Sequence, residues 1–199
     1  QYAPGIHLSV EVFSDSPEVI LKQAKHFKKV FGYEELGVKV HIGWNELGVI
    51  KALSEEGIAV NCTANMKITQ AVMAAVVGAR FVSLFVNRIK DSGIEVLNER
   101  ILSCIEFIKE AGSETARNEL TQKLDWLTHH LKNSVEAMRD GSLDEEDFDP
   151  FYVIRGTREM LERVGLPTQI IAGSIRCATD VKRAFLAGAH IVTVPPKFI

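Results

Sequence analysis

Short apolar runs alternate with amphipathic stretches along most of the chain. Six runs rich in β-branched residues predict strands, over residues 8–13, 36–42, 58–63, 81–86, 168–173 and 190–194. Between these runs apolar residues recur at helical spacing, which predicts helices over residues 18–31, 45–54, 68–77, 151–164 and 177–186. Strands and helices that alternate at this rhythm are typical of βα units on a parallel sheet. The pattern therefore predicts an α/β fold.

The rhythm is interrupted between residues 93 and 147. Residues 93–111 and 114–139 have the spacing of two long amphipathic helices, and an acidic turn follows them. We therefore predict a helical insertion in one βα loop of a single barrel domain, whose other parts are residues 1–92 and 148–199. The apolar faces of the two helices must be buried against another surface. Either they pack against each other as a hairpin, or they close over a site as a lid or join a neighbouring subunit.

Composition argues against several classes of function. The 199 residues carry a net charge of −3, with acidic and basic side chains interspersed, and we expect neither a nucleic-acid nor a membrane partner. No apolar run approaches the roughly 20 residues that span a bilayer, and no signal-peptide pattern opens the chain. Cys62, Cys104 and Cys177 lack the spacing of metal ligands. We expect reduced thiols, no bound metal and a cytoplasmic location.

A lysine inside an apolar strand is the first candidate for chemistry. In the run from Leu36 to Ile42, strand alternation places Lys39 and His41 on one face and aliphatic side chains on the other. Burial makes an ammonium costly and favours the neutral amine, which is the nucleophile that forms a Schiff base with a carbonyl. The alternative interpretation is that Lys39 ends an edge strand and reaches solvent.

Polar residues stand at or near the carboxyl end of each predicted strand, which is where parallel βα barrels hold their active sites. They are Glu11, Lys39, His41, Asn61, Thr63, Ser83, Arg88, Ser174, Arg176 and Thr193. Each has a structural explanation by itself, such as a bond to a loop amide or, for the arginines, a surface ion pair. Together they supply an amine, a carboxylate, hydroxyls and two guanidinium groups. Arg88 and Arg176, with Ser174, predict a phosphate clamp.

The order of these residues resembles that of the transaldolase family. The motifs are Val-Glu-Val at 10–12, Val-Lys-Val at 38–40, Asn-Cys-Thr at 61–63, Ser-Leu-Phe-Val-Asn-Arg at 83–88, Gly-Ser-Ile-Arg at 173–176, and a further similar stretch at 50–58. The resemblance covers residues 8–88 and 152–195. It implies a (β/α)8 TIM-type barrel, here with six recognisable strands and a helical insertion after the sixth-strand position. It also implies an enzyme that needs no cofactor.

The resemblance further implies a transferase of the pentose phosphate pathway. Such an enzyme moves a dihydroxyacetone unit from a ketose phosphate (sedoheptulose 7-phosphate or fructose 6-phosphate) to an aldose phosphate. By resemblance Lys39 attacks the ketose C2 carbonyl, Glu11 transfers protons through a water, and Thr63 holds that water. The positions implied for substrate binding are Asn61, Ser83, Phe85, Arg88, Ser174 and Arg176. Phe85 and Glu11 match transaldolases, because the related fructose-6-phosphate aldolases carry Tyr and Gln at these positions.

The chain departs from the family pattern in two respects. His41 stands where the family has proline, and the family's first two strands and final helix are missing. Those strands carry an aspartate used for proton transfer and a substrate-binding segment, so we expect a fragment of a full enzyme rather than a degenerate protein. Six parallel strands cannot close an eight-stranded barrel without leaving open edges, which also favours a fragment. Separately, we expect sugar-phosphate substrates as partners and a chain that can form a homo-oligomer. The alternative functions are a fructose-6-phosphate aldolase-like enzyme, which releases free dihydroxyacetone, and a non-catalytic barrel fragment whose insertion binds a partner.

Overall fold

The computed structural model describes residues 5–198, and its internal contacts divide the chain into two units. The first unit comprises the residues up to Val86 together with those from Phe151 onward. The second unit is Asn87–Pro150. Each unit has its own buried core and is described by itself below.

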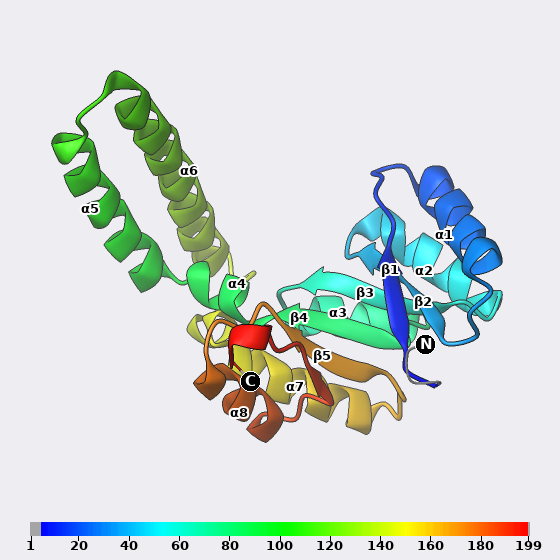
Figure 1. The fold of residues 1–199 in the computed structure, drawn as a ribbon. Helices are drawn as coiled ribbons and strands as arrows, with labels where there is room; N and C mark the ends of the chain where they lie inside the picture. The colour runs from blue at the N-terminus through cyan, green and yellow to red at the C-terminus, as the bar shows by residue number, and fades with distance from the viewer. Residues whose placement is uncertain (1–4, 199) are drawn as a thin grey trace. The chain divides into compact units, whose positions relative to one another are not determined.

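The first unit is built on one sheet of parallel strands that neighbour each other in sequence order (Figure 1). The strands are β1 (Leu8–Glu11), β2 (Leu36–His41), β3 (Ala59–Asn65), β4 (Phe81–Phe85), β5 (Gln169–Gly173) and β6 (Ile191–Val192). Among residues 5–198, β1 pairs only with β2, and β6 pairs only with β5. The sheet is therefore a partial barrel with two open edges, and the predicted α/β, TIM-type fold class is confirmed.

Helices connect the strands as the apolar pattern predicts. They are α1 (Pro17–Phe31), α2 (Trp44–Glu55), α3 (Ile68–Val76), α7 (Pro150–Arg163) and α8 (Ala178–Leu186), with a short 3-10 turn at Pro196–Phe198. Helix α1 begins with proline, whose missing N–H needs no partner in a first turn. It ends at Gly32, whose φ of 55° is left-handed, and the Gly32 N–H donates to the Lys28 carbonyl.

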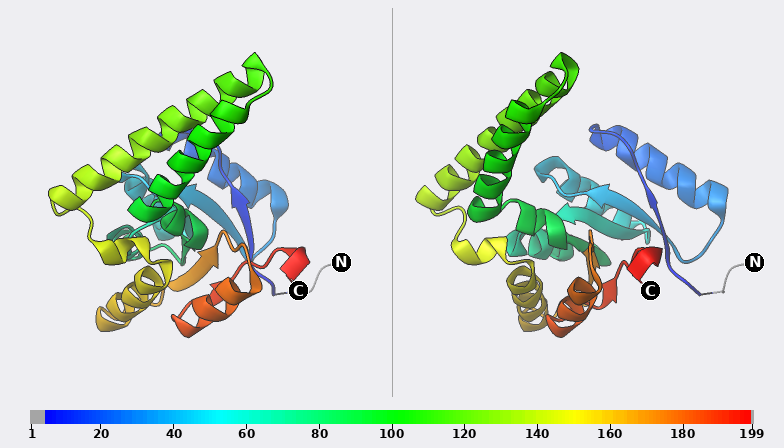
Figure 2. Two further views of the ribbon diagram at one scale, coloured as in Figure 1. Left: turned by 90° about the vertical axis from the view of Figure 1, so that its left-hand side faces the viewer. Right: turned by 60° about the vertical axis from the view of Figure 1, so that its left-hand side comes forward.

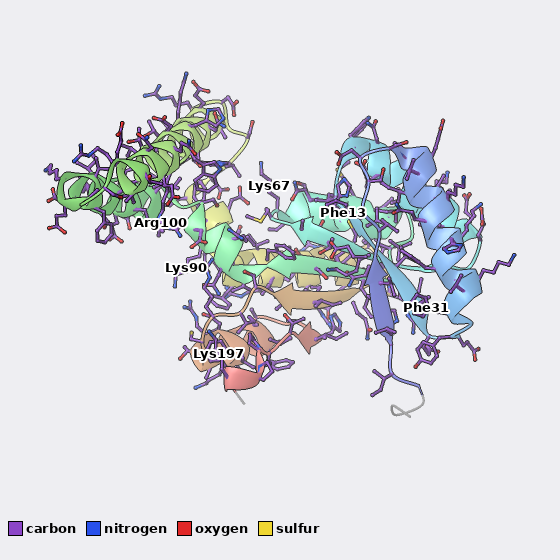
Figure 3. The ribbon with its side chains drawn as sticks, turned by 45° about the horizontal axis from the view of Figure 1, so that its top comes forward. Phe13, Phe31, Lys67, Lys90, Arg100 and Lys197 are labelled. Atoms are coloured by element: carbon purple, nitrogen blue, oxygen red, sulfur yellow. The ribbon has the colours of Figure 1, made fainter. Side chains whose placement is uncertain are left out.

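Two strands are shorter than the sequence predicts by two residues or more. Strand β6 has two residues instead of the five expected, although the N–H groups of His190 and Thr193 on either side of it still donate to the Ile170 and Ala172 carbonyls of β5. Strand β1 has four residues instead of six, and Phe13, which was expected to belong to it, is 94% exposed (Figure 3). Both shortened strands lie at the open edges of the sheet.

Alternation along the strands divides the sheet into an apolar face and a polar face. The buried side chains that form the core of this face come from even-numbered positions, namely Val38, Val40, Val60, Cys62, Val82, Leu84, Ile170 and Ala172. Burial raises the pKa of the Cys62 thiol to about 12, although a contact with Asn65 acts to lower it. All three cysteines are free thiols, and Cys62 is a core side chain rather than a nucleophile.

A buried asparagine determines how β3 ends. The pairing of β3 with β4 changes register between Cys62 and Asn65, and Ala64 between them has a left-handed φ of 63°. Asn65 Nδ2 donates to the Cys62 carbonyl at 2.8 Å and to the Ser83 carbonyl at 3.3 Å. The side chain thus donates to backbone carbonyls of both strands at the irregular part of the ladder, and it ties β3 to β4.

The second unit is helical. It contains α4 (Val86–Asp91, whose first residue belongs to the first unit), α5 (Ile94–Glu110), α6 (Glu114–Arg139) and a 3-10 turn at Glu145–Phe148. Lys90 lies on α4 and Arg100 on α5 (Figure 3), and Arg100 Nη1 pairs with Asp91 Oδ1 at 3.6 Å. Helix α4 was not predicted, because the strand β4 passes into it without an intervening turn residue.

Helices α5 and α6 run side by side as a hairpin (Figure 2). The apolar stripes predicted from the sequence pack against each other, with a core formed by Leu97, Cys104 and Leu127 and by Ile101, Ile108, Leu120, Leu124 and Leu131 around them. Ser113 caps α6, since its Oγ accepts from the Ala116 N–H at 3.2 Å. Of all helices in the described part of the chain, none is both long and apolar enough to cross a membrane.

Candidate active site

A cavity of about 470 Å³ lies on the polar face of the sheet in the first unit. It is lined by His7, Ser9, Lys39, Asn61, Thr63, Ser83, Phe85, Ile171, Gly173, Ser174, Ile191 and Thr193. With the exception of Ser174, which follows β5, these residues have odd numbers, whereas the core of the apolar face uses even ones. The cavity is therefore a direct product of strand alternation.

Strand register brings the predicted residues together. Glu11 on β1 is the register partner of Lys39 on β2, and Lys39 is in turn the partner of Asn61 on β3. His41 is the register partner of Thr63. Because partners in adjacent parallel strands lie on the same face, residues more than twenty positions apart converge on one site.

Lys39 and Glu11 form an ion pair. Lys39 Nζ lies 3.1 Å from Glu11 Oε2 and donates a hydrogen bond to it. The lysine side chain is 27% exposed and the glutamate side chain 56% exposed. The amine is therefore less enclosed than the sequence predicted, because Glu11 belongs to β1, which is an edge strand among the described residues.

A chain of hydrogen bonds orients the amide of Asn61. Ser83 Oγ donates to Asn61 Oδ1 at 2.7 Å, and Asn61 Nδ2 donates to Ser9 Oγ at 3.4 Å. Ser9 Oγ also contacts His7 Nε2 at 2.9 Å. These bonds connect β1, β3 and β4 across the floor of the cavity, so the amide presents a defined donor and acceptor arrangement.

His7 fits into this floor because Gly37 leaves room for its ring. A Cβ on residue 37 would lie 2.4 Å from His7 Cε1. The imidazole packs against Phe81 in a tilted arrangement, with ring centroids 4.4 Å apart. Burial lowers the pKa of His7, and the charge of Arg80 lowers it further. His7 and Ser9 were not predicted as site residues from the sequence, although their odd numbers place them on the same face as Glu11.

Thr63 carries an unusual buried hydroxyl. The residue is 2% exposed, and its Oγ1 has no hydrogen-bond partner among the described residues. Buried hydroxyls are nearly always hydrogen-bonded, and an exception in a polar cavity calls for an explanation. A water or a substrate hydroxyl is the natural partner for this oxygen.

The loop after β5 brings Ser174 to the cavity in a constrained conformation. Its φ is 59°, a left-handed value that is uncommon outside glycine and clusters at functional sites. Arg176 follows two residues later with an exposed side chain, and its backbone N–H donates to Asp180 Oδ2 at 3.4 Å. Arg88, the third residue of the predicted phosphate clamp, lies in α4 of the second unit with an exposed side chain.

No group of three or more histidine, cysteine, aspartate or glutamate side chains within residues 5–198 is arranged to hold a metal ion. The polar groups that line the cavity are an amine, hydroxyls, one amide and one imidazole, and the carboxylate of Glu11 contacts the amine. The site therefore has an amine and a carboxylate in contact, beside polar groups that can bind hydroxyls.

Comparison with known proteins assigns the chain to a family. Residues 3–199 match the family described as Transaldolase/Fructose-6-phosphate aldolase. Because the match spans nearly the whole chain and the sheet has the expected strand order, this protein belongs to that family. The resemblance inferred from the strand-end motifs is thereby confirmed.

Curated relatives agree with this assignment. The chain is 29% identical over 192 residues to a "Probable transaldolase" of Bartonella bacilliformis and 30% identical over 192 residues to one of Alkaliphilus metalliredigens. Each alignment covers 96% of this chain but only 63% and 64% of the respective relative, so the chain spans a little under two thirds of their length. A GMP reductase of Trypanosoma brucei aligns with 94% of this chain and 32% of its own, at 13% identity and a TM-score of 0.47, which is too low a likeness to bear on function.

Proposed function

We propose that this chain carries the Schiff-base centre of a transaldolase, which transfers a dihydroxyacetone unit from a ketose phosphate to an aldose phosphate. The observation that carries the proposal is the contact of Lys39 Nζ with Glu11 Oε2 at 3.1 Å, at the carboxyl ends of adjacent strands and beside a polar cavity. Family membership and the names of the relatives support the reaction class.

The first step is the formation of the Schiff base. Lys39 gives its proton to Glu11, and the neutral amine adds to the C2 carbonyl of the ketose. The carbinolamine then loses its hydroxyl as water, with a proton returned from Glu11 through a bridging water. Thr63 Oγ1, which is buried and has no partner among the described residues, holds that water.

The second requirement is to hold the three-carbon unit on the protein while the acceptor aldose replaces the aldose that has left. Asn61 and Ser83 lie side by side in the cavity and bind the hydroxyls of the dihydroxyacetone moiety. Their mutual hydrogen bond at 2.7 Å keeps the amide oriented before the substrate arrives, which lowers the ordering cost on binding.

The phosphate group binds at the loop after β5. Ser174 lines the cavity, and Arg176 follows it with a guanidinium that matches phosphate oxygens bidentately. Arg88 is assigned to the same role on the sequence resemblance alone.

Phe85 distinguishes transfer from release of free dihydroxyacetone. Its ring lines the cavity and has no hydroxyl with which to activate a water against the bound intermediate. The fructose-6-phosphate aldolase-like alternative would use tyrosine at this position, and Glu11 likewise favours the transferase. We therefore place transfer ahead of release.

Borohydride trapping followed by an acceptor assay tests the function. The purified chain is incubated with fructose 6-phosphate and sodium borohydride, and its intact mass is measured. A Schiff-base enzyme gains a reduced three-carbon or six-carbon adduct, and a transaldolase turns over the donor only when an aldose phosphate is added. Absence of any adduct would contradict the proposal. Turnover without an acceptor would favour the aldolase.

Arg176→Ala is expected to raise KM for phosphorylated ketose donors. KM for unphosphorylated ketoses that donate the same dihydroxyacetone unit should stay unchanged. A hydrogen bond to a charged group contributes about 1.5–3 kcal/mol, so KM should rise about 10-fold to 150-fold. The measurement is steady-state kinetics on both kinds of donor.

Arg163→Ala is the matched control for this variant. Arg163 is an exposed arginine of the same unit, in the last turn of α7 and therefore at the opposite end of the sheet from the carboxyl ends of the strands. Its removal should change neither KM value. Equal losses on both kinds of donor in Arg176→Ala would indicate a structural role for Arg176.

A further inference from the structure

We propose that His7, acting through Ser9, determines the direction of the hydrogen-bond chain at the floor of the cavity, so that Ser83 accepts a proton from a hydroxyl of the bound three-carbon unit. His7 and Ser9 act through Asn61 and Ser83 and are therefore positioning residues. Their role rests on the proposed function, because it refines how the donor is held. Both residues line the cavity, and the reaction steps above leave them unused.

Four side chains form this hydrogen-bond chain. His7 Nε2 lies 2.9 Å from Ser9 Oγ, and Ser9 Oγ accepts from Asn61 Nδ2 at 3.4 Å. Asn61 Oδ1 in turn accepts from Ser83 Oγ at 2.7 Å. All four side chains line the cavity. The imidazole is thus connected, through a hydroxyl and an amide, to the hydroxyl of Ser83.

The chain crosses β2 at a glycine. Strand β2 lies between β1 and β3, and the register partner of Ser9 on β2 is Gly37. A Cβ on residue 37 would lie 2.4 Å from His7 Cε1 and 2.8 Å from His7 Nε2, so any side chain there would displace the imidazole. Gly37 therefore leaves the space through which Ser9 on β1 reaches Asn61 on β3.

The imidazole sets the direction of the chain, because hydroxyls can donate or accept whereas a ring nitrogen does only one of the two. Ser9 Oγ accepts from Asn61, so the proton of the Ser9 hydroxyl needs an acceptor of its own. The lone pair of His7 Nε2 is that acceptor when the ring is neutral and carries its proton on Nδ1. Every group then donates toward His7, and the lone pairs of Ser83 Oγ are left for the substrate.

The second ring nitrogen is consistent with this tautomer. Nδ1 of His7 is buried and has no partner of good hydrogen-bond geometry among the described residues. The backbone of Glu35 is nevertheless close enough to act on the ring and raise its pKa. Because Nε2 faces Ser9, this backbone contact belongs to Nδ1, where it favours a proton.

The surroundings of His7 favour the neutral ring. Burial is the largest cause that lowers the pKa of His7, and the positive charge of Arg80 lowers it further. Glu35 raises the pKa and Lys28 lowers it slightly, while Arg80 Nη1 and Glu35 Oε2 pair with each other at 3.5 Å. Lys39 is the other titratable side chain among the described residues that line the cavity. The ring therefore stays neutral to a lower pH than an ordinary histidine does.

Protonation of His7 would reverse the chain. An imidazolium has a proton on both nitrogens, so Nε2 then donates to Ser9 Oγ. The Ser9 proton turns toward Asn61, the amide turns over to accept it on Oδ1, and Asn61 Nδ2 donates to Ser83. Ser83 now directs its own proton into the cavity, where a substrate hydroxyl previously met an acceptor. We therefore expect KM for the donor to rise as the pH falls through the lowered pKa of His7.

Two variants of His7, assayed with fructose 6-phosphate and an aldose phosphate, test this role. His7→Phe keeps a ring beside Phe81 but has no acceptor for the Ser9 proton. Its KM for the donor should rise about 5-fold to 150-fold while kcat stays within about threefold of wild type, as expected when a buried polar group loses its partner. His7→Gln offers an acceptor oxygen that does not titrate. It should raise KM less than His7→Phe does, and its KM should lack the rise at low pH.

His26→Phe is the matched control, because His26 is an exposed histidine of α1, and this variant should change neither KM nor its pH dependence. Proton–nitrogen NMR spectra of histidine-labelled wild-type protein report the tautomer of His7 independently of activity. At neutral pH they should show the proton on Nδ1 and a bare Nε2.

A proton on Nε2 of His7 at neutral pH would overturn the inference, and so would equal KM values for wild type and His7→Phe. Should His7→Phe fail to fold, a wild-type KM that did not rise as His7 titrated in the same spectra would also overturn it. Wild-type protein that forms no borohydride-trapped adduct would instead contradict the proposed function. The spectra would then still decide the direction of the chain.

Discussion

Lys39→Ala is expected to abolish both the borohydride-trapped adduct and transfer activity, with kcat falling on the order of 10⁴-fold or more, as for other nucleophile deletions. The reason is that the covalent route needs an amine at the carboxyl end of β2, beside Glu11 Oε2. The measurements are intact mass after reduction and the rate of donor consumption with an aldose phosphate present. Lys39→Arg should not restore either signal, because guanidinium stays protonated and cannot attack a carbonyl.

Lys51→Ala is the matched control for the nucleophile. Lys51 lies on α2 with an exposed side chain that pairs with Glu55 at 3.9 Å, and its removal should change neither trapping nor transfer. Both lysine variants should unfold at nearly the wild-type denaturant concentration, because surface ion pairs contribute little to stability. Peptide mapping that located the adduct on Lys51 or Lys67 would show that Lys39 is the wrong residue.

Asn65→Ala is expected to lower the free energy of unfolding by about 2–4 kcal/mol, because it removes two buried hydrogen bonds to backbone carbonyls. The side chain is fully buried, and its Nδ2 bridges the Cys62 and Ser83 carbonyls across the register shift between β3 and β4. Urea denaturation followed by circular dichroism measures this change. The midpoint should fall while the slope of the transition stays constant.

Asn118→Ala is the matched control, because it removes an asparagine that does not lie at the register shift between β3 and β4. Asn118 is exposed on α6, and its replacement should change stability by no more than about 0.5 kcal/mol. If both asparagine variants unfolded at the same urea concentration, the bridge across the register shift would have no energetic role. A stable Asn65→Ala protein with a lower rate of adduct formation would show that the bridge instead positions Thr63.

The candidate site could be predicted largely because strand alternation is a local property. Lys39 and His41 share a face for the same reason that Asn61 and Thr63 do, and the cavity lies on that face. The amphipathic pattern of residues 93–139 likewise predicted two helices whose stripes meet. Order along the chain therefore sufficed to place most of the residues that line the cavity.

Other features of the site did not follow from local pattern. The hydrogen bond between Ser9 and Asn61 joins residues 52 positions apart, and His7 enters the floor only because residue 37 lacks a side chain. The carboxylate of Glu46 lies close to His41 because α2 begins directly after Gly43, where a side chain would collide with that carboxylate. Helix α4 begins where a strand was expected to end, and this moves Arg88 from a strand terminus to a helix.

The sequence by itself determined the type and order of the elements, the polar face of each strand and the family to which the chain belongs. These features depend only on residues that are close together in the chain, namely on hydrophobic periods of two and 3.6 residues and on short motifs. Only the tertiary structure decided which polar groups touch. The contact of Lys39 with Glu11, the oriented amide of Asn61 and the unpartnered hydroxyl of Thr63 all depend on strand register and on close packing between distant segments. A one-residue slip of register would send each of these side chains to the other face of the sheet.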